Sequence, residues 1–288
     1  MNKVAKVLRK KVLNDSVTLL EVDAPLVARK ALAGQFIILR IDEEGERIPL
    51  TIADYDREKG SVTIIFQKVG LTTQLLGDLE VGDEIRDFVG PLGLPTEIGA
   101  AVKRVCVVGG GVGCAIAYPQ AKSLHNAGIA VDVIAGFRSK DIVILEEEFR
   151  AVCDNLYLTT DDGSYGEKGF VTDKLKSLID GGNHYDLVIA IGPIPMMKFV
   201  SKTTEPYGIK TLVSLNPIMV DGTGMCGGCR VTVGGKVKFA CVDGPDFDGH
   251  QVDFDELMNR NSLYREREAC EKDRHACRME QLKRSAIQ

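Results

Sequence analysis

Three cysteines and one aspartate in the last quarter of the chain have the spacing of a metal-cluster site. Asp221, Cys226 and Cys229 are separated by four and two residues, and Cys241 follows after eleven more. With cysteine in all four places, this spacing ligates 2Fe–2S clusters in plant-type ferredoxins. Glycines at 222, 224, 227 and 228 let the backbone wrap closely and point N–H groups at cluster sulfides. We therefore predict that Asp221, Cys226, Cys229 and Cys241 hold a 2Fe–2S cluster.

A structural zinc site is the alternative, because a CxxC pair also forms one half of a zinc ribbon. The nearby sequence supplies neither a second CxxC nor a histidine pair, and the four histidines of the chain lack zinc spacing. The other cysteines suit packing better than ligation. Cys106, Cys114 and Cys153 lie in apolar surroundings, while Cys270 and Cys277, seven residues apart, would share one face of a helix.

Composition limits the classes of protein that this chain can belong to. Its 288 residues suggest two domains and a small appendage, and its net charge of −5 argues against nucleic acid or an anionic membrane as partner. No apolar run approaches the ~18 residues that span a bilayer. The first residues lack the apolar core of a signal peptide, and eight cysteines without an export signal favour a reducing compartment. We expect a cytoplasmic protein.

The first hundred residues are typical of an antiparallel β-barrel. Short alternating runs separated by Gly and Asp turns predict six strands, with one helix at Thr72–Leu79 across an open end. The predicted strands are Val4–Val12, Val17–Val22, Gln35–Ile41, Ile48–Ala53, Ser61–Val69 and Glu84–Val89.

Two segments of this barrel have residues that suit a flavin nucleotide. Arg47 on a strand could grip a pyrophosphate with two hydrogen bonds, and Pro49, Leu50 and Thr51 would form a wall beside a flat ring. The second segment, Gly70, Leu71, Thr72 and Thr73, leads into a helix whose first N–H groups suit a phosphate. Taken singly, Arg47 could be a solvated arginine and Thr72 an ordinary helix cap.

From Arg104 onward, apolar strands alternate with helical stretches, which predicts a doubly wound parallel sheet. Three glycine-rich loops fall at strand ends, where such sheets bind ligands. They contain Gly109, Gly110, Gly111, Val112 and Gly113, then Asp161, Asp162 and Gly163, then Gly192, Pro193 and Met196. No acid ends the second strand, and Arg138 stands there instead, which leaves a 2′-phosphate conceivable.

The predicted organisation has four parts. They are a barrel (1–100), an α/β nucleotide domain (101–216), a cluster module (217–250) and a charged helical tail (251–288). Within the module, Val242–His250 is rich in Gly, Asp and Pro and is expected to form a turn. The tail is too polar to bury itself and is predicted to pack on a partner.

These motifs together resemble the ferredoxin–NADP reductase superfamily over nearly the whole chain. The resemblance rests on Arg47-x-Pro-Leu-Thr51, Gly70-x-Thr-Thr73, Gly90-Pro-Leu-Gly93, Gly109–Ala115, Thr160–Gly166 and Ile191–Met196. Two kinds of electron-transfer subunit in it look most similar. One is the iron–sulfur subunit of NAD-linked dihydroorotate dehydrogenase, which looks like a four-cysteine binder. The other is the small subunit of the electron-bifurcating NADH-dependent reduced ferredoxin:NADP oxidoreductase, also called sulfide dehydrogenase, and three cysteines with Asp221 favour it.

The resemblance implies FAD at the barrel segments, NAD(H) at the three sheet loops and a 2Fe–2S cluster at the cysteines. Flavin can exchange a hydride with the nicotinamide and single electrons with the cluster, so it stands between them. The implied partner is a larger flavin/4Fe–4S subunit in a heterodimer, with ferredoxin reached through the complex. We predict no acid–base catalytic residue. A nucleotide-binding redox sensor with structural zinc is the alternative of another class.

Overall fold

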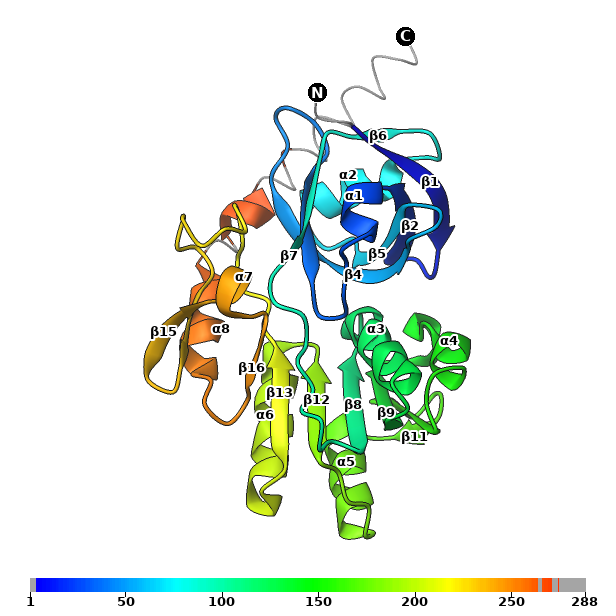
Figure 1. Cartoon of the computed structure of the whole chain (residues 1–288), viewed down its shortest axis with the longest axis vertical. Helices are drawn as coiled ribbons and strands as arrows, with labels where there is room; N and C mark the ends of the chain where they lie inside the picture. The colour runs from blue at the N-terminus through cyan, green and yellow to red at the C-terminus, as the bar shows by residue number, and fades with distance from the viewer. Residues whose placement is uncertain (1–3, 264–265, 271–273, 275–288) are drawn as a thin grey trace.

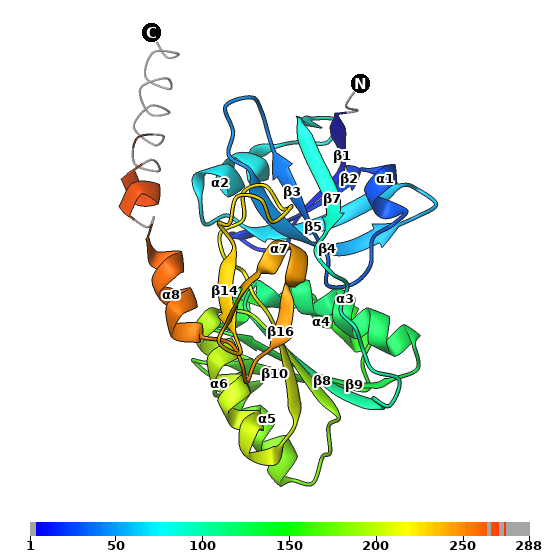
Figure 2. The same ribbon diagram turned by 60° about the vertical axis from the view of Figure 1, so that its left-hand side comes forward.

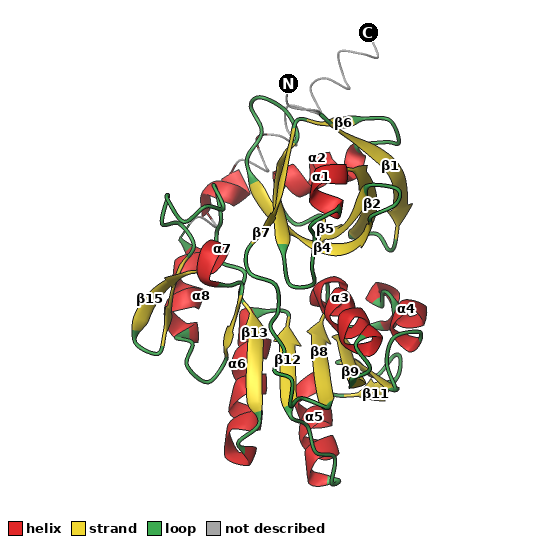
Figure 3. Cartoon of the chain, in the orientation of Figure 1, coloured by secondary structure: helices red, strands yellow, loops and turns green. Residues whose placement is uncertain are grey.

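The computed structural model describes residues 4–263, 266–270 and 274. An antiparallel barrel comes first in the chain, then a parallel sheet flanked by helices, then a small two-stranded sheet with short helices (Figures 1 and 3). This is the predicted fold class. The residue boundaries given above for the four parts stay a prediction.

The barrel is one antiparallel sheet whose two ends nearly meet. Its order is β6-β1-β2-β5-β4-β3-β7, and the edge strands β6 and β7 are separated in the chain only by Arg86, so the sheet must curl round on itself. The sequence predicted β6 and β7 as a single strand. The strands are β1 (Ala5–Val12), β2 (Val17–Asp23), β3 (Phe36–Arg40), β4 (Ile48–Asp56), β5 (Ser61–Gln67), β6 (Glu84–Ile85) and β7 (Asp87–Leu92), with helices α1 (Pro25–Ala28) and α2 (Leu71–Asp78).

Alternation along the strands fills the barrel and also joins it to the next domain. On β5, Val62, Ile64 and Phe66 are buried inside the barrel, whereas Ile65 faces outward and is also buried. Ile65 belongs to the apolar core of the nucleotide sheet and helix α3 (Gly113–Asn126). An ion pair of 2.7 Å between Lys122 of α3 and Asp54 of β4 lies at the same junction. The barrel is therefore fixed against α3 by both apolar and charged contacts.

The second sheet has the order β11-β10-β9-β8-β12-β13-β16, with β8 at the point where the chain reverses its direction of winding. The carboxyl ends of β8 and β12 therefore lie side by side, and the chain leaves them in opposite directions. Ligands of doubly wound sheets bind at this switch point. Its strands are β8 (Arg104–Gly110), β9 (Ala130–Phe137), β10 (Asn155–Thr160), β11 (Glu167–Lys168), β12 (Leu187–Ile191), β13 (Lys210–Ser214) and β16 (Asp246–Asp248). The helices besides α3 are α4 (Glu146–Arg150), α5 (Val171–Asp180) and α6 (Ile194–Thr204), with single 3-10 turns at Lys140–Ile142 and Glu205–Tyr207.

The sheet ends with a strand that the sequence did not predict. β16 pairs antiparallel with β13, and Val213 lies opposite Phe247. Helix α7 (Ala240–Asp243) begins the same segment, so the prediction of a simple turn at Val242–His250 was wrong. The linker from the barrel also meets this segment, because Leu94 N donates to Gly244 O and the Thr96 hydroxyl donates to Asp246. The segment formed by α7 and β16 thus contacts both the nucleotide sheet and the linker that leaves the barrel.

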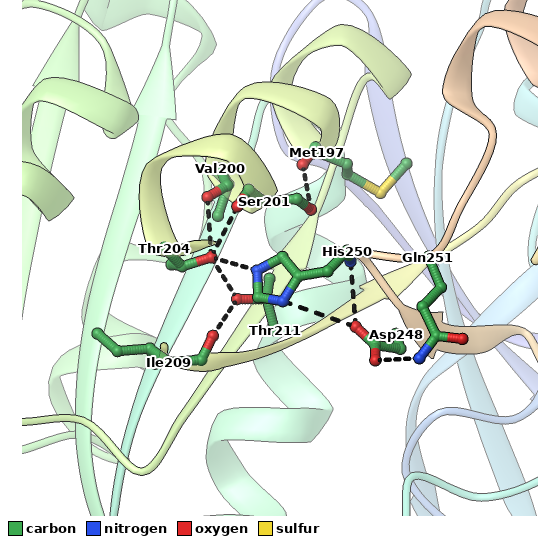
Figure 4. Close-up of polar contacts among 9 residues, drawn as sticks. All are labelled: Met197, Val200, Ser201, Thr204, Ile209, Thr211, Asp248, His250 and Gln251. Carbon is green, nitrogen blue, oxygen red and sulfur yellow. Dashed lines mark hydrogen bonds and ion pairs between the residues drawn. The ribbon is translucent and has the colours of Figure 1, made fainter. Parts of the chain in front are cut away.

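His250, just after β16, closes a small polar network with α6 and β13 (Figure 4). Its ring Nε2 lies 3.0 Å from the hydroxyl of Thr204, which is also 2.6 Å from the hydroxyl of Thr211. Both threonines are fully buried, and backbone carbonyl oxygens complete their hydrogen bonding: the Thr204 hydroxyl also donates toward Val200 O and Ser201 O, and the Thr211 hydroxyl donates to Ile209 O. This network attaches the end of the cluster module to α6 and β13 of the nucleotide domain.

Thr204→Val is expected to destabilise the protein by about 0.5–1.5 kcal/mol, because it removes the hydroxyl that Thr211 and His250 share, while Thr211 keeps its hydrogen bond to Ile209 O. Thermal unfolding of the purified protein measures this loss. Thr203→Val is the matched control, since Thr203 makes the same kind of bond to its own helix but is exposed. Equal melting temperatures for the two variants would contradict the role given to the network.

The cluster module begins with a long loop, residues 215–229, which we call the cluster loop. It continues with β14 (Arg230–Val233), β15 (Lys236–Phe239) and α7. Helix α8 (Phe254–Ser262) comes after β16 and packs beside α6, burying Phe254 and Leu257 (Figure 2). Residues 266–270 are also helical, which agrees with the predicted helical tail as far as the chain is described. Cys277 lies outside the described residues. No helix among those described has the length and apolar character needed to cross a membrane.

Candidate functional site

The predicted flavin wall lies on β4, where the strand faces alternate. Pro49, Leu50 and Thr51 pair with Ile38, Ile37 and Phe36 of β3. Leu50 packs against the barrel core, so Pro49 and Thr51 point to the opposite face. Both are partly exposed. The arrangement leaves a small, stiff and partly polar surface on the outside of the barrel, which suits one side of a planar ring.

Arg47 precedes β4 and reaches toward the cluster loop. Its Nε donates a 2.9 Å hydrogen bond to the carbonyl oxygen of Val220, the residue before Asp221. Neither terminal guanidinium nitrogen has a hydrogen-bond or ion-pair partner among the residues that the structure describes. Two parallel donors of this kind fit a phosphate or pyrophosphate.

The second predicted phosphate segment forms the start of α2. Thr73 Oγ accepts hydrogen bonds from the N–H groups of Val69 and Gly70, which shapes the turn into the helix. The first bond of the helical ladder runs from Gln74 N to Gly70 O, so the N–H groups of Leu71, Thr72 and Thr73 precede that ladder. Thr72 donates its hydroxyl to Glu46 at 2.8 Å, next to Arg47. The two predicted flavin segments therefore meet at residues 46 and 47.

The glycine loop lies at the carboxyl end of β8, as predicted. Gly109 and Gly110 end the strand, Gly111 turns with a φ of +56°, and Val112 caps α3 before Gly113. A β-carbon at Gly113 would lie 2.5 Å from the carbonyl oxygen of Ile191, so the loops after β8 and β12 touch backbone to backbone. Only glycine permits this approach.

The third loop packs directly on the first. Gly192 and Pro193 follow β12, and Met196 stands in the first turn of α6. A β-carbon at Gly110 would lie 2.4 Å from Met196 Sδ, which shows that the thioether fills the space between the two loops. Met196 therefore supports the loops in this structure, in addition to any contact with a nucleotide.

The acidic loop follows β10 and is tied to the end of β9. Asp161 N and Asp162 N donate to the carbonyl oxygens of Phe137 and Arg138. The Asp162 carboxylate accepts from the Ser164 hydroxyl and N–H, which lowers its pKa, and Gly163 turns with a φ of +76°. Asp162 thus organises its own loop. Asp161, Asp162 and Gly163 are exposed at the same sheet edge as Gly111.

Two of the predicted cluster ligands meet in the interior. Cys229 precedes β14 and Cys241 follows β15, and the pairing of these strands brings their sulfurs to 3.2 Å with almost no exposure. Two sulfurs on one tetrahedral metal with bonds of about 2.3 Å lie about 3.8 Å apart, so the pair is close to ligand spacing. Burial and the neighbouring Cys229 thiol raise the pKa of Cys241 to about 12. A thiolate here therefore needs a compensating metal charge.

The other two predicted ligands form a second pair. One carboxylate oxygen of Asp221 accepts from the N–H and hydroxyl of Thr223, and the other accepts from Cys226 N at 2.8 Å. Hydrogen bonds from Thr223, then from Cys226, hold the pKa of Asp221 well below its usual range. Asp221 therefore shapes the loop as an anion, while the Cys226 thiol is exposed.

The four side chains do not converge on one point. Among the residues described, no three His, Cys, Asp or Glu side chains come close enough to hold a single ion. Two pairs suit a cluster of two irons, each of which takes two protein ligands, better than one zinc ion. The assignment of Asp221, Cys226, Cys229 and Cys241 as ligands stays a prediction, and the donor set fits it.

Sequence reasoning missed Glu46 and the backbone of Val220. Glu46 belongs to no motif, so nothing in the sequence marked its contact with Thr72. The bond to Val220 uses a carbonyl oxygen, which every residue has, so no residue type could have marked it.

Comparison with known proteins agrees with this arrangement. Residues 216–253 match the iron–sulfur cluster binding domain of dihydroorotate dehydrogenase B. A homolog of the electron transfer subunit of dihydroorotate dehydrogenase B (NAD(+)) from Thermotoga maritima is 50% identical over 247 residues, which cover 86% of each chain. An uncharacterised protein of Clostridium beijerinckii is 56% identical over 270 residues, or 91% of each chain.

Solved structures extend the similarity to the fold as a whole. A chain in the structure of an NADH-dependent reduced ferredoxin–NADP oxidoreductase is 45% identical, with a TM-score of 0.90, over 96% of this chain and 99% of that one. The cytochrome b5 reductase domain of Ulva prolifera nitrate reductase, at 19% identity and a TM-score of 0.58, covers 72% of this chain and 93% of that one and shares the fold. This chain belongs to the family of the dihydroorotate dehydrogenase B electron transfer subunits and their homologues, built on the ferredoxin-reductase fold.

Proposed function

We propose that this chain is the small subunit of an electron-bifurcating NADH-dependent ferredoxin–NADP oxidoreductase, acting as a flavin iron–sulfur electron-transfer enzyme. One observation carries the proposal: a chain of such an oxidoreductase is 45% identical to this one over 99% of its own length, with the barrel, parallel sheet and cluster module in the same arrangement. The cofactors are FAD, a 2Fe–2S cluster and NAD(H). Bound FAD exchanges a hydride with the nicotinamide and single electrons with the cluster.

The chain's own residues hold and separate these groups. Arg47 and the first turn of α2 would bind the FAD pyrophosphate, with Pro49 and Thr51 beside the ring. The loops at Gly109–Gly113, Asp161–Gly163 and Gly192–Met196 would bind NAD(H) at the edge of the sheet that faces the barrel (Figure 1). Asp221 with Cys226, and Cys229 with Cys241, would each hold one iron.

The partner in this proposal is a larger flavin/4Fe–4S subunit that receives electrons from the cluster and reaches ferredoxin in the cytoplasm. Two features support an external acceptor. Met225 of the cluster loop is 90% exposed beside the exposed Cys226, so the cluster region opens to the surface. The polar helical residues after α8, including exposed Cys270, would help to hold the partner.

Stopped-flow mixing with the anaerobic protein tests the nucleotide and the flavin together. We expect NADH to bleach the flavin absorbance faster than NADPH at equal concentration, with cluster reduction following. Arg138 at the end of β9 is exposed and is the residue that could hold a 2′-phosphate, so Arg138→Ala is the matched variant. Faster reduction by NADPH, lost in Arg138→Ala, would reverse the nucleotide assignment.

The electron-transfer subunit of dihydroorotate dehydrogenase is the second candidate, because the cluster domain and the Thermotoga maritima homolog are described by that enzyme. Asp221 in place of a fourth cysteine favours the first candidate. Anaerobic co-purification decides between them. A partner that carries 4Fe–4S clusters and flavin supports the proposal, whereas a partner that oxidises dihydroorotate would replace it with the second candidate.

A further inference from the structure

The predicted flavin site and the cluster loop are in direct contact through one side chain. Arg47 donates its Nε proton to Val220 O, although the two residues are 173 positions apart in the sequence. The carbonyl of Val220 immediately precedes Asp221, the first predicted cluster ligand. The bond uses only one of the five donors of the guanidinium group, and its terminal nitrogens keep their fork for a phosphate.

Close packing holds the same loop against the barrel. Gly222 turns with a φ of +79° and is buried against the middle of β3 and the end of β7. A β-carbon there would lie 2.7 Å from Leu92 Cδ1 and 2.8 Å from Ile38 Cδ1. Asp221 therefore stands between two fixed points, the hydrogen bond at Val220 and the contact at Gly222. A displacement of Arg47 would therefore also displace the loop that contains Asp221.

Glu46, the neighbour of Arg47, makes a corresponding contact with the second phosphate segment. Its carboxylate accepts from the hydroxyl of Thr72, which is 6% exposed in the first turn of α2. Glu46 thus contacts the start of α2, and the next residue, Arg47, contacts the cluster loop. A phosphate bound between Arg47 and α2 would restrain this segment and, through Nε, the loop.

We propose that Arg47 is a positioning residue for the iron–sulfur loop as well as a flavin ligand, so that FAD binding and cluster retention are coupled. The inference rests on the proposed function, since it needs both cofactors. Coupling between two ligands is reciprocal, so the cluster must strengthen FAD binding by the factor by which FAD stabilises the cluster. Lysine at position 47 would keep the charge for the phosphate but has no planar fork with a separate Nε donor.

The test measures iron loss to a ferrous chelator and the reduction potential of the cluster, each with and without FAD. In the native protein, saturating FAD is expected to slow iron loss about 5-fold or more, the lower end for coupled sites, and to shift the potential. In Arg47→Lys, excess FAD should still restore the flavin spectrum, but neither effect of FAD should remain. Arg47→Ala should lose FAD on dilution as well.

Arg86→Ala is the matched control, because Arg86 is also a barrel arginine but pairs at the surface with Glu43. It should keep the full effect of FAD on iron loss. Equal protection by FAD in Arg47→Lys and the native protein would overturn the inference. So would native protein in which FAD changes neither iron loss nor potential. A native protein without flavin or a 2Fe–2S spectrum would instead overturn the proposed function, before any variant is compared.

Discussion

Cys229→Ser should weaken cluster binding by more than the about 10–100-fold that losing a supporting contact costs a metal site. The purified protein should therefore contain much less iron and sulfide than the native protein. Cys229 is 1% exposed and its sulfur lies 3.2 Å from that of Cys241, so serine leaves one buried thiol without its partner ligand. Visible absorbance and electron paramagnetic resonance of the dithionite-reduced protein measure the loss. At saturating FAD the flavin should still bind, because the predicted flavin segments lie on the barrel, but its affinity should fall by the factor by which FAD stabilises the cluster.

Cys270→Ser is the control for this prediction, since Cys270 is an exposed thiol outside the cluster module. It should retain iron, sulfide and spectrum. Native iron content and an unchanged spectrum in Cys229→Ser would show that this pair does not hold the cluster.

Asp221 needs a separate comparison, because its carboxylate also organises the loop through Thr223 and Cys226. Asp221→Cys should keep a 2Fe–2S centre and shift its reduction potential, since sulfur replaces oxygen on one iron. Thr223→Val removes a hydrogen bond to the carboxylate without changing a predicted ligand, and it isolates the loop effect. Asp221→Ala with native spectrum, iron content and potential would remove Asp221 from the ligand set.

Gly113→Ala should slow flavin reduction by NADH about 5- to 150-fold, the range that corresponds to roughly 1–3 kcal/mol of overpacking. The added carbon would stand 2.5 Å from Ile191 O and 2.7 Å from Gly192 Cα, and both are backbone atoms that no rotamer change can move. The glycine loops after β8 and β12 must then separate at the predicted nucleotide site. Stopped-flow reduction over a range of NADH concentrations measures the effect, while dithionite should still reduce flavin and cluster.

Gly99→Ala provides the comparison, because a β-carbon at Gly99 meets nothing within 4 Å. Its rate should match that of the native protein. A native rate in Gly113→Ala would mean that the nicotinamide does not use this junction of loops.

The sequence predicted those elements whose patterns are local. Alternation in Ser61–Val69 and the apolar run Arg104–Val108 were enough to indicate a barrel strand and a parallel-sheet strand, which the structure has at Ser61–Gln67 and Arg104–Gly110. The glycines at 110 and 113 marked the loop correctly, because a close backbone approach needs glycine whatever the partner is. The spacing of the cysteines likewise indicated a cluster, and the family comparison agrees with it.

Features that depend on pairing between distant segments could not be predicted in this way. β16 has three residues in a stretch of Asp, Gly and Pro, and only its hydrogen bonds to β13 make it a strand. The approach of the predicted ligands Cys229 and Cys241 follows from the register of β14 and β15, which aligns Arg230 with Phe239. Neither the bond from Arg47 to Val220 nor that from Thr96 to Asp246 has a local signature.

The pairing of β13 with β16 has a consequence for how the cluster region folds. Because these strands are neighbours, everything between Ser214 and Asp246 is topologically the insert of a single enlarged β-hairpin whose stem belongs to the nucleotide sheet. The stem holds the two ends of the insert together, and the entropy of closing a loop grows only slowly with its length. Iron therefore binds to an insert whose two ends are already held together by the pairing of β13 with β16. Unlike a free-standing metal-nucleated finger, this cluster module has its two ends held together by strand pairing and not by the metal.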